Sequence, residues 1–217
     1  MELMDSLQMK PEEIERESFR IIDAEAGEHG WPADEWQVVR RVIHTSADFE
    51  YVRSLVMSDN CVREGCEALR AGYGIVTDTR MALSGISRAR ISRFGNRVVC
   101  HVSDDDVAGE ARERGITRSV AAMRKAVRDE RNRIFVIGNA PTALFELVRL
   151  IRAGKAEPAL IVGLPVGFVG AAESHEALVS AGLDIPFITN IGRKGGSNVA
   201  AAVINALAVL AAPCPCL

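Results

Sequence analysis

The stretch RVIHTSADFEY, residues 41–51, places an imidazole just before two hydroxyls, two carboxylates and two aromatic rings. Its His44 is one of four histidines in the chain. Histidine is the side chain whose ordinary pKa lies closest to neutrality, so His44 could pass a proton to a bound substrate. A histidine at a helix end can instead be a C-terminal cap that contacts the last carbonyl groups. Position alone favours neither interpretation.

An amphipathic helix must hold this histidine. PADEWQVVRRVIH puts Trp36, Val39 and Ile43 on one side, and His44 falls in or just past the last turn. The negative end of the helix dipole favours the imidazolium form, so we expect a raised pKa and a better proton donor. An earlier helix is predicted in PEEIERESFRIIDAEAGEHG, where the hydroxyl of Ser18 interrupts an apolar stripe.

From residue 74 onward, β-rich runs alternate with helical patterns, which is typical of a parallel sheet. We expect an α/β protein with a flavodoxin-like, doubly wound sheet of five parallel strands. The expected strands are residues 74–78, 97–102, 133–138, 159–164 and 185–190. One domain is predicted over 1–217, with a helical N-terminal extension (1–60), a βα core (74–211) and a flexible tail (213–217). The clearest helix begins with Pro141 at its first position and ends at Gly154.

Ligands of such sheets bind beyond the carboxyl ends of the strands. Glycine-rich loops that lead into helices occur there, and their backbone amides attract anions. In GRKGGSN, Gly195 and Gly196 could let a ligand approach the backbone, and Ser197 could cap the next helix. A plain strand-to-helix turn is the alternative for each loop. Asp104, Asp105 and Asp106 could bind a cation but more often form a solvated cap, and His101 is expected to be a packed, hydrogen-bonded residue within a strand.

Composition excludes several classes of function. The net charge is -3 and no basic run is interleaved with aromatics, so nucleic acid is not an expected partner. Five cysteines without a C-x-x-C pair favour a reducing cytoplasm over a disulfide framework, and we expect no metal site, including at Cys214 and Cys216. The start lacks the features of a secretory signal. The apolar run 198–212 is too short to cross a bilayer and predicts a buried terminal helix.

Six strings carry a resemblance to a known family: RVIHTSADFEY, TDTRMALSGI, GITRSVAAMR, IGNAPTALFEL, LIVGLPVGFVGAAESHEAL and GRKGGSNVAAAVINALA. In order and in spacing, from about residue 10 to 211, they resemble precorrin-8X methylmutase, also called precorrin isomerase. The resemblance implies a cytoplasmic homodimer with a flavodoxin-like fold that acts on a tetrapyrrole with acetate and propionate arms. It implies an intramolecular isomerase that moves a methyl group on ring C to give hydrogenobyrinic acid, without a dissociable cofactor.

The resemblance also assigns residues. It puts the catalytic histidine at His44, and it places Ser18, Arg41, Thr117 and Arg118 in contact with substrate. Gly195, Gly196 and Ser197 lie in the glycine-rich string and are expected to bind substrate as well. Arginines suit carboxylate arms because the guanidinium forms paired hydrogen bonds, although Arg41 could also be a snorkelling side chain at a helix end. The chain departs from the family at His175, where many relatives have lysine, and in its CPCL tail.

Three alternatives remain open. Cobalt-precorrin-8 methylmutase, which acts on a cobalt-containing substrate, shares the same motifs. A non-catalytic corrinoid-binding protein would keep the anion-attracting edge but would not need His44. A flavodoxin-like flavin or nucleotide protein would bind its phosphate at a glycine-rich loop.

Overall fold

The computed structural model describes residues 9–212. Its strands are β1 (Leu55–Met57), β2 (Gly74–Thr77), β3 (Val98–Val99), β4 (Asn132–Ile137), β5 (Leu160–Gly163) and β6 (Phe187–Asn190). Its helices are α2 (Pro11–Ala26), α3 (Ala33–Ser46), α4 (Tyr51–Ser54), α5 (Cys61–Arg70), α6 (Arg80–Gly85), α7 (Arg88–Ile91), α8 (Asp105–Arg114), α9 (Arg118–Ala126), α10 (Pro141–Arg152), α11 (Ala171–Val179) and α12 (Ser197–Leu210), with a 3-10 turn, η1 (Ser92–Phe94).

The strands form one sheet in the order β1-β6-β5-β4-β2-β3. The strands β2 to β6 are parallel, whereas β1 runs antiparallel to β6, with Leu55 opposite Asn190. The expectation of five strands is therefore wrong in number. The missed strand is three residues long and lies directly after α4, inside a segment expected to be helical.

Each of the five expected runs contains a strand, but the run 97–102 yields only two strand residues, Val98 and Val99. β3 is an edge strand that pairs with β2 at Ile75 and Val76 alone. The chain then turns away, and the N–H of Asp104 donates to the carbonyl of His101 at 3.0 Å. His101 therefore lies in the loop after the strand and not within it.

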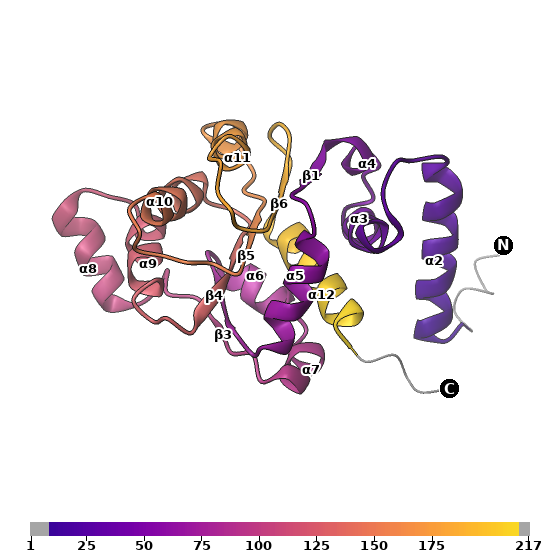
Figure 1. Cartoon of the computed structure of the whole chain (residues 1–217), viewed down its shortest axis with the longest axis horizontal. Helices are drawn as coiled ribbons and strands as arrows, with labels where there is room; N and C mark the ends of the chain where they lie inside the picture. The colour runs from indigo at the N-terminus through magenta and orange to yellow at the C-terminus, as the bar shows by residue number, and fades with distance from the viewer. Residues whose placement is uncertain (1–8, 213–217) are drawn as a thin grey trace.

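Alternation along the central strands explains the two covered faces. In β4, Ile134 and Val136 join the core beneath α3, α5 and α12, whereas Phe135 and Ile137 join the core beneath α9, α10 and α11. A strand buried on both faces has no polar side, which is why RIFVIG has no polar positions after its first residue. Figure 1 shows α8, α9 and α10 on one side of the sheet and α3, α5 and α12 on the other, with α2 outermost beside α3.

The helices α3 and α12 join the N-terminal segment to the sheet. Ten of the fourteen residues of α12 are buried, as expected of a buried terminal helix. α3 packs on it through Val38, Val39, Val42 and Ile43, each 1% exposed or less. The packing fixes one side of α3 in the core and leaves the other side, which carries His44, facing outward.

Candidate active site

His44 lies in the last turn of α3, on its exposed side. The helix ends at Ser46, and the left-handed residue Ala47 donates its N–H to the carbonyl of Ile43 at 2.7 Å. Among residues 9–212 the imidazole has no hydrogen-bond partner, so it does not act as a cap in this structure. The ring instead tilts against Phe19 of α2, with centroids 5.3 Å apart and planes at 49°.

The facing sides of α2 and α3 bring Arg41 and His44 against Glu15 and Phe19. Glu15, Ser18 and Phe19 are three and four residues apart and share one side of α2. Arg41 reaches this side, since its Nη1 lies 2.6 Å from Oε1 of Glu15 and its guanidinium carbon 4.7 Å from the Phe19 ring centroid. Arg41 is therefore paired within the chain, and only 15% of its side chain is exposed.

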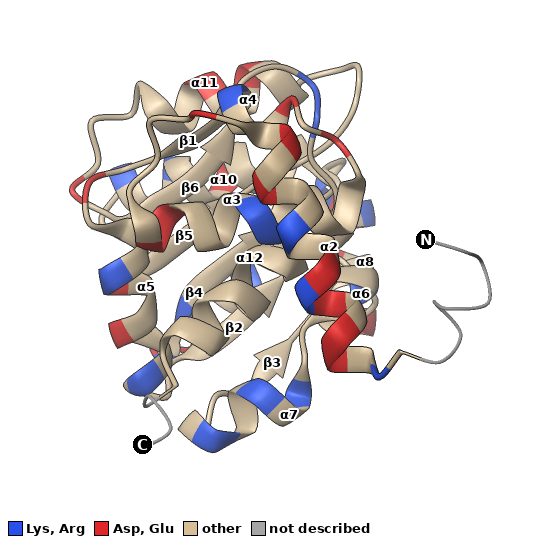
Figure 2. Cartoon of the chain, turned by 90° about the vertical axis from the view of Figure 1, so that its right-hand side faces the viewer, with Lys and Arg blue, Asp and Glu red and all other residues tan. Residues whose placement is uncertain are grey.

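The hydroxyl of Ser18 is also engaged, because it donates to the carbonyl of Ile14 at 2.8 Å. Glu15 is the residue of this group that the sequence did not single out. Its hydrogen bond from Arg41 holds the pKa of the Glu15 carboxyl below its usual value, and the positive charges of Arg41, Arg90 and His44 act in the same direction. Figure 2 shows the acidic residues of α2 beside the basic residues of α3.

The two residues after His44, Thr45 and Ser46, line a cleft of about 530 Å³ at the carboxyl edge of the sheet. Its walls come from the end of α3 and the segment after it, from the loop after β5, and from the loop after β6 with the start of α12. They comprise Thr45, Ser46, Asp48, Tyr51, Val166, Gly167, Phe168, Arg193, Lys194, Gly195, Asn198 and Val199. His44 is therefore next to the edge where parallel sheets bind ligands.

Lys194 joins two walls of this cleft through ion pairs. Its ammonium donates to the carboxylate of Asp48 and lies 2.7 Å from that of Glu50. The hydrogen bond from Lys194 lowers the pKa of Asp48, and the two carboxylates raise that of Lys194. Burial raises the pKa of the nearby Tyr51 to about 12, so its hydroxyl stays protonated near neutrality. Sequence reasoning missed these residues because Asp48 and Lys194 are 146 residues apart.

The glycine-rich segment after β6, which the sequence suggested as a ligand-binding loop, packs closely against the loop after β5. A Cβ on Gly195 would lie 2.3 Å from the carbonyl oxygen of Leu164, so the two backbones fill the space that we expected for a ligand. Gly196 donates its N–H to the same carbonyl at 2.9 Å. The expected cap at Ser197 is wrong, because Gly196 takes the N-cap position and the hydroxyl of Ser197 bonds to that of Thr79 at 2.7 Å.

Thr117 and Arg118 lie elsewhere, at the start of α9. Thr117 caps this helix by accepting the N–H of Val120 at 3.2 Å, and its hydroxyl lies 3.1 Å from that of Thr142 on α10. Both Thr117 and Arg118 are exposed. Because α9 and α3 cover opposite faces of the sheet (Figure 1), one chain does not bring Arg118 to His44.

Asp78, at the end of β2, fills an anion-binding position with the chain's own carboxylate. It is 1% exposed and accepts the N–H groups of Gly138, Asn139 and Ala140, where β4 leads into α10, at 2.7–2.9 Å. Burial raises the pKa of this carboxyl, and the three N–H groups, which bond to its ionised form, oppose the rise. These amides lie at the carboxyl ends of β2 and β4, which are neighbours in the sheet although β3 lies between them in sequence. In other doubly wound sheets, the crevice at this position binds phosphates. The carboxylate takes the amides that a flavin or nucleotide phosphate would need.

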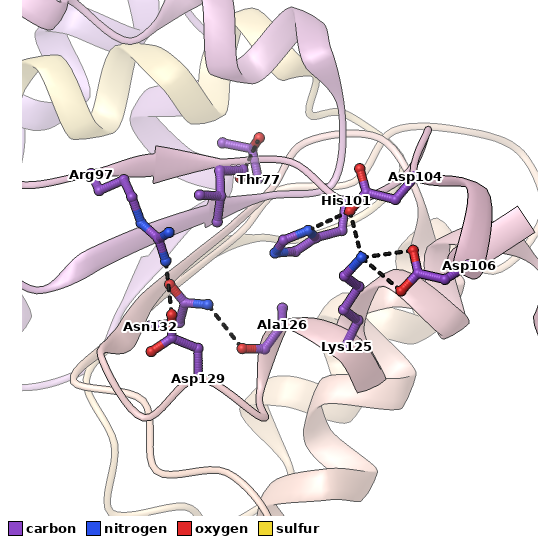
Figure 3. Close-up of polar contacts among 10 residues, drawn as sticks. Thr77, Arg97, His101, Asp104, Asp106, Lys125, Ala126, Asp129 and Asn132 are labelled. Carbon is purple, nitrogen blue, oxygen red and sulfur yellow. Dashed lines mark hydrogen bonds and ion pairs between the residues drawn. The ribbon is translucent and has the colours of Figure 1, made fainter.

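Two of the three acids at the start of α8, Asp104 and Asp106, form ion pairs (Figure 3). Asp104 takes the expected N-cap position, but its side chain does not bond to the helix N–H groups, and Asp105 is exposed. Oδ2 of Asp104 lies 2.8 Å from both Nδ1 of His101 and Nζ of Lys125, and Asp106 bonds the same ammonium at 2.7 Å. His101 is thus hydrogen-bonded as expected, although outside the strand. Across residues 9–212, no group of three or more His, Cys, Asp or Glu side chains could hold a metal ion. Cys214, Cys216 and the tail 213–217 lie outside the described residues.

His175, the position where the chain departs from its resemblance, is a buried support on α11 with 1% exposure. Its Nδ1 lies 2.9 Å from the carbonyl oxygen of Gly192 in the loop after β6. Burial lowers the pKa of its imidazole, so the neutral form is favoured and Nδ1–H is the donor. His175 therefore holds a cleft-forming loop in place from beneath.

Comparisons with known proteins agree on one family. A family model described as precorrin-8X methylmutase matches residues 13–210. A protein of Priestia megaterium named cobalt-precorrin-8 methylmutase is 47% identical over 94% of this chain and 90% of its own length. One of Pseudomonas aeruginosa named precorrin-8X methylmutase is 45% identical over 90% of this chain and 93% of its own.

A solved structure of precorrin-8X methylmutase from Thermus thermophilus has a TM-score of 0.83 and 43% identity, and it covers 91% of this chain and 96% of that one. No helix within the described residues is long and apolar enough to span a membrane.

Proposed function

Because the chain belongs to the precorrin-8X methylmutase family, a family of isomerases in cobalamin biosynthesis, we propose that it moves a methyl group on ring C of precorrin-8X and gives hydrogenobyrinic acid. The bond from the methyl group to the α carbon breaks and one to the adjacent β carbon forms, so substrate and product have the same atoms. No co-reactant and no dissociable cofactor is required. The observation that carries this proposal is the exposed imidazole of His44, whose next two residues line the carboxyl-edge cleft.

His44 acts as a proton donor to a pyrrole nitrogen, or as a strong hydrogen-bond donor to it. Partial positive charge on the macrocycle stabilises the shifting electrons during the migration, and the proton returns to the imidazole afterwards. An imidazole without a hydrogen-bond partner among residues 9–212 is available for this task, whereas one bonded to a carbonyl would first have to break that bond. The Phe19 ring holds it from the side.

The carboxylate arms are bound by the remaining predicted residues. Ser18 and Arg41 lie on the same side of the molecule as His44, and a substrate arm would replace Glu15 on the Arg41 guanidinium. Gly195 forms part of the cleft wall, and Gly196 with Ser197 supports it from behind.

Thr117 and Arg118 favour a homodimer. They lie on the opposite face from His44, so a site that uses all three needs α9 of a second copy. The order of the five parallel strands, β3-β2-β4-β5-β6, supports a flavodoxin-like fold extended by β1. We also infer a cytoplasmic location for this biosynthetic step.

A His44→Ala variant tests the assignment. It should still bind the tetrapyrrole and should lose turnover, measured as the visible absorbance change of purified enzyme with precorrin-8X. A variant with wild-type turnover would exclude the proton-donor role. It would instead support the non-catalytic, corrinoid-binding alternative if the wild-type protein also binds without turnover.

Cobalt-precorrin-8 methylmutase is the second candidate function. Relatives of both names match the chain equally well, with 47% identity to the Priestia megaterium protein and 45% to the Pseudomonas aeruginosa protein. Offering the purified protein both substrates in parallel decides which one is converted.

A further inference from the structure

The loop between β5 and α11 exposes three large apolar side chains, Val166, Phe168 and Val169. Phe168 is 85% exposed and Val169 is 90% exposed, the highest values among the large hydrophobic residues that the structure describes. Apolar side chains gathered on an exposed surface mark contact sites in soluble proteins. Phe168 also lines the cleft that begins beside His44.

Several interactions hold the loop that carries Phe168. The N–H of Gly167 donates to the carbonyl of Arg193 at 3.2 Å, which joins the loop after β5 to the loop after β6. Gly195 packs directly against the backbone of Leu164, and His175 holds Gly192 from beneath. A side chain presented by a fixed backbone binds a ligand with less loss of conformational entropy.

Arg193 adds a charge that no carboxylate of the described residues neutralises. Its guanidinium carbon lies 5.7 Å from the centroid of the Phe168 ring, within range of a cation–π contact. Among residues 9–212, no carboxylate lies within 4.0 Å of it. Its neighbour Lys194 is engaged by Asp48 and Glu50, so Arg193 is the cation of this cleft that can bind an anion.

We propose that Phe168 and Arg193 form a substrate-binding platform, a proposal that rests on the proposed function. The ring of Phe168 packs on the flat face of the tetrapyrrole at the mouth of the cleft. The guanidinium of Arg193 binds one peripheral carboxylate through two parallel hydrogen bonds. An apolar ring beside an unpaired cation suits a ligand that is flat and apolar at its centre and anionic at its edge.

A second copy of the chain is the rival occupant of this surface. Burying Arg193 in a subunit contact would leave an unpaired charge unless the partner supplied a carboxylate, and an uncompensated buried charge is strongly destabilising. The free charge therefore favours an anionic ligand over a subunit contact.

The test is titration of the full chain with hydrogenobyrinic acid, followed by quenching of protein fluorescence. We expect Phe168→Ala to raise the Kd about tenfold, as the loss of an aromatic contact does. Phe168→Tyr keeps the ring and should bind like the wild type. We expect Arg193→Gln to raise the Kd about tenfold to a hundredfold, because a charge-assisted hydrogen bond is lost.

Matched controls are Val209→Ala and Arg128→Gln, an exposed apolar residue and an exposed, unpaired arginine that lie outside the cleft. Their Kd should not change. Equal binding by the wild type, Phe168→Ala and Arg193→Gln would overturn the platform but leave the proposed function intact. A wild-type protein that does not bind the probe would overturn both. A Phe168→Ala protein whose subunit assembly changes in size-exclusion chromatography would assign the surface to a second copy instead.

Discussion

Replacing Gly195 with alanine distinguishes a packing role from a ligand role for the glycine-rich string. The new Cβ would lie 2.3 Å from the carbonyl oxygen of Leu164 and 2.5 Å from that of Pro165, so one backbone must move by about 1 Å. Such overpacking costs about 1–3 kcal/mol. Loss of the 2.9 Å bond from Gly196 to Leu164 adds about 1 kcal/mol. We expect the free energy of unfolding to fall by about 2–4 kcal/mol and Tm by roughly 5–15 °C.

Urea unfolding followed by tryptophan fluorescence measures this change. The matched control is Gly109→Ala in α8, where an added Cβ meets nothing within 4 Å. Because glycine inside a helix is unfavourable, that variant should gain about 0.5–1 kcal/mol. A Gly195→Ala protein with wild-type stability and weakened tetrapyrrole binding would refute the packing argument and restore direct approach of the ligand to the backbone.

Three further changes have defined outcomes. Asp78→Asn should lower the free energy of unfolding, measured by urea titration, by about 1–3 kcal/mol, because the amide cannot accept all three backbone N–H groups. The control Asp105→Asn, at an exposed position, should change it by no more than about 0.5 kcal/mol. Equal effects of the two substitutions would contradict this role of Asp78. Hydrogen bonds from Arg149 and Arg124 lower the pKa of Glu146, so the ionised carboxylate stabilises the fold above about pH 5, and this stabilisation is lost as the pH falls through the lowered pKa. Glu146→Gln should therefore weaken the dependence of the free energy of unfolding on pH in the acid range. An unchanged dependence would exclude this contribution of Glu146. If each site of a homodimer uses His44 of one chain and Arg118 of the other, mixing the His44→Ala and Arg118→Ala proteins should restore about a quarter of wild-type turnover, because half of the dimers are mixed and each of these has one intact site. No recovery would exclude a shared site.

Local patterns were sufficient for the helices that form the candidate site. The start of α10 at Pro141 and the place of His44 in the last turn of α3 follow from residue types a few positions apart. The buried side of α3 follows from apolar spacing alone. The approximate positions of the five parallel strands were predictable for the same reason, since continuous apolar runs between helices identify them.

Contacts between distant segments were not predictable. β1 is three residues long, and its pairing with Ile188–Asn190 spans more than a hundred residues, so no local pattern marks it. The carboxylate of Asp78 and the ammonium of Lys194 both bind partners on separate segments. A glycine in a sequence signals close approach, but it does not say whether a ligand or another backbone approaches, and at Gly195 it is the backbone of Leu164.

On the proposed function, the exposure of His44 places a condition on catalysis. Hydrogen bonds and charges act more strongly when water is excluded, and in a single chain the imidazole faces solvent. Phe19 covers it from one side only, so another surface must complete its environment. On the proposed function, the flat tetrapyrrole can supply that surface once Phe168 and Arg193 hold it across the cleft mouth. The proton donor then reaches its effective environment only with substrate bound, which makes correct placement of the macrocycle a requirement for turnover as well as for affinity.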